Sequence, residues 1–122
     1  MDDLLKNINS LKQVEEIEHY IDDYSPIYLS GLTDGFKPHL VLTLFKKFNE
    51  TCLVIAENEK KAEEYVNDIN GVCGDSAIYY PNLDINFYNI KAVDNENLSQ
   101  RINVLTKLSK NEKYIIMIKN YI

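Results

Sequence analysis

One turn in the sequence has the spacing of a phosphate-binding loop, so the first chemistry to consider is nucleotide binding and hydrolysis. In a working loop, G-x-x-x-x-G-K-[ST], backbone amides surround the phosphates, the lysine reaches the terminal phosphates and the hydroxyl binds magnesium. The corresponding residues of this chain are Gly31-Leu32-Thr33-Asp34-Gly35-Phe36-Lys37-Pro38. Lys37 occupies the position of the motif lysine.

The other key positions of this motif carry residues that oppose phosphate binding. Phe36 replaces the second glycine, and its ring takes the space that the chain needs to wrap a phosphate. Pro38 replaces the Ser/Thr and has neither a hydroxyl for magnesium nor an N–H for phosphate. Asp34 adds negative charge at a helix N-terminus, where an anion would otherwise lie. We interpret Gly31–Pro38 as a degenerate phosphate loop and expect no cofactor, although a plain strand-to-helix turn explains the same residues.

A second group of residues could contact a nucleic acid or a protein partner. Its aromatic and charged members are Tyr79, Tyr80, Asp84, Phe87, Tyr88 and Arg101. Such rings can stack on bases, but Asp84 and Asp94 flank the segment and no basic residue adjoins it. We therefore favour a loop whose rings cover a sheet edge or a partner surface. Arg101 is expected to hold this loop through an ion pair worth ~0–1 kcal/mol, with Asp84, Asp94 and Glu96 as candidate partners.

The remaining reactive side chains do not suggest a catalytic or metal site. Two cysteines and two histidines could supply zinc ligands, but Cys52, Cys73, His19 and His39 lack the paired spacing of known zinc sites. We expect free cysteines, because disulfides are rare in a reducing compartment. No nucleophile with a neighbouring base can be nominated. The chain is therefore expected to bind no metal and to have no enzyme activity of its own.

Length, composition and charge narrow the class of protein. The chain has 122 residues, of which 45% are hydrophobic and 26% charged, as in ordinary globular domains. No apolar stretch approaches the ~18 residues of a membrane span, and the acidic start Met1-Asp2-Asp3 does not resemble a secretion signal. We therefore expect a cytoplasmic protein. The net charge of −6 and the single arginine disfavour stand-alone nucleic-acid binding.

The elements that would position these residues alternate between strand and helix after a helical amino-terminal segment. Residues 1–24 are expected to form two short helices, ended by Ser25-Pro26. Strands are predicted at 27–29, 51–56, 76–80 and 113–118, and helices at 37–49, 58–69 and 95–109. Four strands separated by helices predict an α/β domain over residues 25–122, with a mainly parallel sheet and helices on both faces.

The loop and the pieces that follow it resemble one protein family. Leu29–Leu40 resembles the degenerate loop near the start of the bacterial transcription-repair coupling factor, the Mfd family. The downstream pieces follow in the family's order: a strand with a helix start, a strand before a proline and an aromatic loop, a helix and a last strand. They are Leu53–Glu59, Ile78–Pro81 with Asp84 and Phe87-Tyr88, Gln100–Ile102 with Leu105 and Leu108, and Lys113–Lys119.

This resemblance covers roughly residues 26–119. It implies a degenerate, helicase-like domain similar to the first domain of UvrB, and an amino-terminal, non-catalytic module of an ATP-dependent DNA translocase that displaces stalled RNA polymerase and recruits excision repair. The implied partners are other domains of the parent chain, with UvrA, RNA polymerase and double-stranded DNA bound mostly by regions outside this module. Two alternatives stay open: a residual nucleotide-binding domain that uses Lys37, and a DNA-binding domain that uses the aromatic residues.

The resemblance also raises a question about the sheet. In helicase-type sheets the loop-bearing first strand is separated from the early strands by later strands, which this chain lacks. Unpaired sheet edges recruit other strands. We therefore predict that the chain either shifts its strands to close the gap or forms a homo-oligomer through exposed sheet edges.

Overall fold

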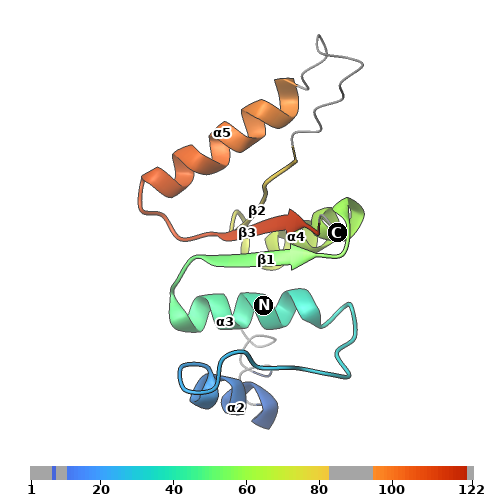
Figure 1. Ribbon diagram of the computed structural model, residues 1–122, viewed down its shortest axis with the longest axis vertical. Coiled ribbons are helices and arrows are strands. Elements are labelled where there is room, and N and C mark those ends of the chain that lie inside the picture. Colours follow the sequence, from blue (N-terminus) through green and yellow to red (C-terminus); the bar gives the residue numbers. More distant parts are fainter. Residues whose placement is uncertain (1–6, 8–10, 83–94, 121–122) are drawn as a thin grey trace. The chain divides into compact units, whose positions relative to one another are not determined.

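The computed structural model describes residue 7, residues 11–82 and residues 95–120 (Figure 1). The chain forms two compact units, residues 1–49 and residues 50–122. The domain boundary predicted after residue 24 falls inside the first unit. No helix in the described ranges is long and apolar enough to cross a membrane.

In its described residues the first unit includes the helices α2 (Lys12–Tyr20) and α3 (Lys37–Phe48). They share one apolar cluster, whose buried members are Val14, Ile17 and Leu40. Apolar side chains recur at helical spacing along α2, so one of its faces can be buried while its carboxylates stay in water. The helix α3 begins at the residue predicted for it and ends at Asn49, which adopts the left-handed conformation that often follows a helix.

The structure corrects the prediction of a first strand at residues 27–29. Residues 27–29 have no regular secondary structure and are not part of the described sheet, and Tyr28 is 91% exposed. Among the described residues, no backbone hydrogen bond is made by this segment. Three apolar residues favour an extended backbone, but only a neighbouring strand can satisfy their N–H and C=O groups. The described sheet has three strands instead of about four.

The second unit is a small parallel α/β structure (Figure 1). Its elements follow in the order β1 (Cys52–Ala56), α4 (Glu59–Cys73), β2 (Ala77–Tyr79), α5 (Asn95–Ser109) and β3 (Ile115–Lys119). The strand β3 lies between β1 and β2 and pairs in parallel with both, so the sheet order is β1-β3-β2. The prediction of a parallel sheet within an α/β fold is therefore confirmed.

The two helices of the second unit cover opposite faces of the sheet. Ile116 of β3 packs with Ile78 of β2 and Val104 of α5. Its neighbours Ile115 and Met117 are fully buried and, because side chains alternate along a strand, point to the other face, where α4 contacts all three strands. The chain runs from β1 past β3 to β2 and then returns to β3, so crossovers of one hand must lie on opposite faces.

The structure also corrects the end predicted for α4 at residue 69. The pair Asn70-Gly71 predicts a helix end, but α4 continues to Cys73 and stops at Gly74, whose φ is +68°. Asn70 faces the next strand instead. Its Oδ1 accepts from the backbone N–H groups of Ser76 (3.0 Å) and Ala77 (2.8 Å), and its Nδ2 donates to the carbonyl of Ala77 (2.9 Å). Asn70 therefore ties α4 to the beginning of β2.

Candidate functional site

The turn with the spacing of a phosphate loop leads directly into α3. The N–H groups of Phe36 and Lys37 both donate to the carbonyl of Thr33, at 3.1 and 3.2 Å. Gly31 has a φ of +77°, which a residue with a side chain rarely adopts. Gly35, the glycine nearest to the motif position, has no such φ. The turn is therefore closed by its own backbone, and the amides of Phe36 and Lys37 are already donating.

Phe36 belongs to the core of the first unit. Its half-buried ring packs against Val14 and Ile17 of α2 and Leu40 of α3. Beside it lies a cavity of about 470 Å³, and none of the residues that line this cavity is charged. A phosphate in this cavity would have no cation to neutralise it, so the space beneath the turn suits apolar packing and not an anion.

Lys37 and Pro38 complete the degenerate loop. The Nζ of Lys37 lies 3.0 Å from Oδ1 of Asp34, so the turn itself supplies a counter-charge to the motif lysine. Pro38 is buried in the first turn of α3, where its missing N–H costs nothing. The structure thus brings the predicted loop residues together, but as an internal ion pair and a packed ring.

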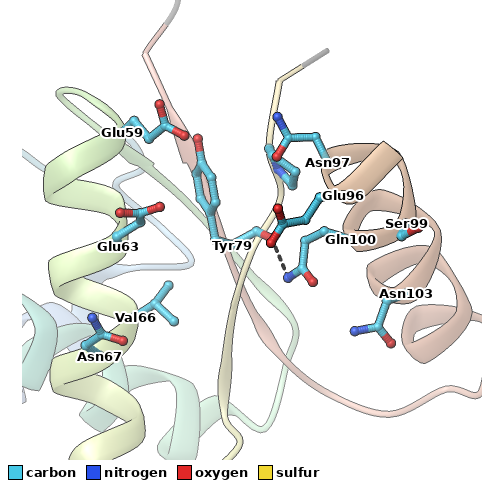
Figure 2. Close-up of a pocket in the computed structure, with 11 residues that line it drawn as sticks. Glu59, Glu63, Val66, Asn67, Tyr79, Glu96, Asn97, Ser99, Gln100 and Asn103 are labelled. Carbon is cyan, nitrogen blue, oxygen red and sulfur yellow. Dashed lines mark hydrogen bonds between the residues drawn. The ribbon is translucent and has the colours of Figure 1, made fainter. Parts of the chain in front are cut away.

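A polar pocket of about 640 Å³ lies in the second unit, at the carboxyl end of β2 (Figure 2). Figure 2 shows Tyr79 between the first halves of two helices, with Glu59 and Glu63 of α4 on one side and Glu96 of α5 on the other. Gln100 closes the α5 side by donating from Nε2 to the carbonyl of Tyr79, at 3.1 Å. The other lining residues are Val66, Asn67, Pro81, Asn97, Ser99 and Asn103.

This pocket lies where ligands commonly bind in α/β folds, but its negative charge disfavours a phosphate. Ligands of open α/β sheets bind beyond the carboxyl ends of the strands. The three glutamates face no lysine, arginine or histidine among the lining residues, so a nucleotide or a nucleic acid would be repelled. In the described part of the chain, no group of three or more His, Cys, Asp or Glu is placed to hold a metal ion.

The predicted interaction residues of the aromatic group divide between two places. Tyr79 lines the acidic pocket, whereas Tyr80 packs on the opposite face with Ile78 and Val104. Rings on opposite faces of a sheet cannot form one stacking platform for bases. The remaining members, Asp84, Phe87 and Tyr88, lie outside the described residues.

Arg101 holds the chain that leaves β2 through an aromatic ring and a backbone carbonyl. Its guanidinium lies 4.4 Å from the centre of the Tyr80 ring, and Nη1 donates to the carbonyl of Pro81 at 3.1 Å. Of the three carboxylates predicted as its partners, Asp84 and Asp94 lie outside the described residues, so the predicted ion pair stays a prediction. Ring stacking and the carbonyl are the contacts that the described residues show.

The two cysteines are free and half-buried. Burial raises the pKa of the Cys52 thiol, and the nearby carboxylate of Glu50 raises this pKa further. The thiolate is the nucleophilic form of cysteine, and it is disfavoured at this position.

Sequence reasoning missed the acidic pocket. Its local signal is present, because Glu59 and Glu96 each follow a predicted helix start. What brings the two helix starts together is the order of the strands, which no local pattern specifies. No protein-family model, no curated protein and no solved structure matches the chain. Function is therefore inferred from residues and geometry.

Proposed function

We propose that the chain is a non-catalytic interaction module of a transcription-repair coupling factor. The main support for a non-catalytic role is that the three key residues of the phosphate-loop motif serve packing and pairing within the turn. Phe36 packs into the apolar cluster, Lys37 is paired with Asp34, and Pro38 is buried at the start of α3. The assignment to a coupling factor is supported by the resemblance of Leu29–Leu40 and of the pieces that follow it.

In this proposal the module acts as a scaffold for neighbouring domains of its own cytoplasmic parent chain, an ATP-dependent DNA translocase. UvrA, RNA polymerase and double-stranded DNA would be bound mainly by regions outside the module. The negative charge of the chain supports a role in binding proteins and not DNA. Residues 1–24 contain seven carboxylates and two lysines, and the pocket at the end of β2 adds three glutamates. Such surfaces suit protein partners better than nucleic acid.

A titration of labelled ATP with magnesium tests the loss of nucleotide binding. We expect no saturable binding tighter than about 100 μM, because the amides of Phe36 and Lys37 already donate within the turn, Lys37 is paired with Asp34, and the Phe36 ring packs on the apolar cluster. Lys37→Ala should therefore leave the titration unchanged, as should the control Lys46→Ala in the same helix. Tighter binding that Lys37→Ala abolishes and Lys46→Ala preserves would contradict the proposal and favour a residual nucleotide-binding domain.

A gel-shift assay at low salt tests the DNA-binding alternative. We expect no shifted species with single-stranded or double-stranded DNA, since salt bridges to phosphate need clustered cations. The variants Tyr79→Ala and Tyr88→Ala provide the comparison. A shift that either substitution removes would identify the aromatic residues as a nucleic-acid contact and overturn the scaffold assignment.

A further inference from the structure

The outer side of β1 is an open edge of the sheet. On the side that faces β3, the N–H of Cys52 donates to the carbonyl of Tyr114 at 3.1 Å, and the carbonyl of Ala56 accepts from the N–H of Asn120 at 2.7 Å. Backbone groups alternate in direction along a strand, so the N–H and C=O groups of Leu53 and Ile55 point to the outer side. In the described ranges no strand pairs there, so this edge offers two donors and two acceptors.

The opposite edge of the sheet, on β2, is closed by side-chain amides. The outward N–H and C=O of Ala77 are bonded to Asn70, at 2.8 and 2.9 Å. The outward carbonyl of Tyr79 accepts from Gln100 at 3.1 Å. Blocking an edge in this way prevents another strand from adding to it. One edge of the sheet is thus protected, and the other is left available.

The open edge is also apolar. Cys52–Ala56 contains no charged or amide side chain. Leu53 and Ile55 are 65% and 63% exposed on the face that also carries their register partners Ile116 and Ile118. A cavity of about 340 Å³ lies on this face, and all of its lining residues are apolar or aromatic. Exposed apolar surface next to unpaired backbone is typical of a protein interface.

The residues of β1 fit a second copy of the same strand. Antiparallel pairing about a two-fold axis through Val54 places Leu53 opposite the partner's Ile55 and Ile55 opposite the partner's Leu53. These are the residues with outward backbone groups, so each of the two pairs exchanges two N–H···O bonds. Val54 then meets itself in a non-hydrogen-bonded pair, where side chains approach most closely.

Neighbouring registers are less favourable. An axis through Leu53 places Ile55 opposite Thr51, and an axis through Ile55 places Leu53 opposite the carboxylate of Glu57. The axis through Val54 instead pairs apolar residues with apolar residues throughout β1, and it places Glu57 opposite Thr51, so no two carboxylates face each other.

We propose that β1 is a dimerisation strand, through which two copies of the chain join their sheets in antiparallel fashion about an axis at Val54. A two-fold pairing of this kind is closed, because each copy uses its single open edge. The proposal does not depend on the function proposed above, since it rests only on the backbone and side chains of the sheet.

Cross-linking tests the register. In a background of Cys52→Ser and Cys73→Ser, Val54→Cys should form an inter-chain disulfide under mild oxidation, because facing Cα atoms in a non-hydrogen-bonded pair are about 4.5 Å apart. The matched variant Leu53→Cys should cross-link far more slowly, because it faces Ile55 of the other copy. Equal rates for the two variants would overturn the proposal.

Sedimentation equilibrium tests the dimer without cross-links. With rising concentration, the apparent mass should increase from 14.2 kDa towards about twice this value. Ile55→Lys should keep the chain monomeric, because it places a charge in the interface. Ile102→Lys changes a residue of similar exposure (56%) on α5 and should leave the dimer intact. A monomer at every concentration, or growth into larger aggregates instead of a dimer, would overturn the proposal.

Discussion

Replacing Phe36 by alanine should lower the free energy of unfolding by about 2–3 kcal/mol. The half-buried ring packs against the cluster of Val14 and Ile17 of α2 and Leu40 of α3, and its removal leaves a space beside this cluster. Urea denaturation followed by far-UV circular dichroism measures the change. The expected loss is below the 3–5 kcal/mol of a fully buried Phe→Ala change, because part of the ring is in water.

Phe48→Ala is the matched control, since it makes the same substitution at the exposed end of the same helix. We expect it to cost less than about 1 kcal/mol. If the two variants were equally stable, Phe36 would not be a core residue, and the ring would merely fill the phosphate position of the turn. The interpretation of the loop as a packing element would then be wrong.

Replacing Asn70 by alanine should lower the free energy of unfolding by about 3 kcal/mol, since partly buried groups left unsatisfied cost about 1–3 kcal/mol each. The substitution removes the partner of two N–H groups, on Ser76 and Ala77, and of the Ala77 carbonyl. Thermal and urea denaturation should both report the loss. Because the β2 edge is also opened, the variant should be more prone to associate at high concentration.

Two comparisons isolate the role of this amide. Asn67→Ala, an exposed position about one turn earlier in α4, should change stability by no more than about 0.5 kcal/mol. Asn70→Asp keeps the acceptor for the two N–H groups but faces the Ala77 carbonyl with an oxygen, so its stability should lie between wild type and Asn70→Ala. Equal losses for Asn70→Asp and Asn70→Ala would show that these hydrogen bonds are not what stabilises the connection.

The elements predicted well are those with local signals. The helix α5 covers the predicted residues Asn95–Ser109 and ends where predicted, because its apolar residues repeat at helical spacing. The start of α4 follows from Asn58, whose Oδ1 accepts from the N–H of Lys61 at 2.9 Å, as an N-cap should. The start of α3 follows from Pro38, which suits only the first turn of a helix.

The features that the sequence does not predict depend on partners in other secondary-structure elements. Residues 27–29 are as apolar as a strand, but no neighbouring strand completes them. Asn70-Gly71 reads as a turn until β2 supplies partners for the amide of Asn70. The charge of Arg101 predicts carboxylate partners but does not predict its contacts with the ring of Tyr80 and the carbonyl of Pro81. Residue type alone does not indicate which of several possible partners a side chain or a strand contacts.

The candidate site was predicted in part. The types of Asp34, Phe36 and Pro38 indicated a loop unable to hold a nucleotide, and that hypothesis needed no tertiary information. The packing of Phe36 against α2 could not be predicted, because Val14 and Ile17 are separated from it by a segment without regular structure. The acidic pocket was likewise hidden, since it joins helix starts at Glu59 and Glu96 that are far apart in sequence.

The position of β3 between the other two strands has a consequence for how the protein is made. During synthesis β1 and β2 leave the ribosome first, yet within the described sheet their only strand neighbour is Ile115–Lys119, which is added last. The sheet can therefore assemble only after translation of its centre, and nascent chains must keep two apolar strands from aggregating until then.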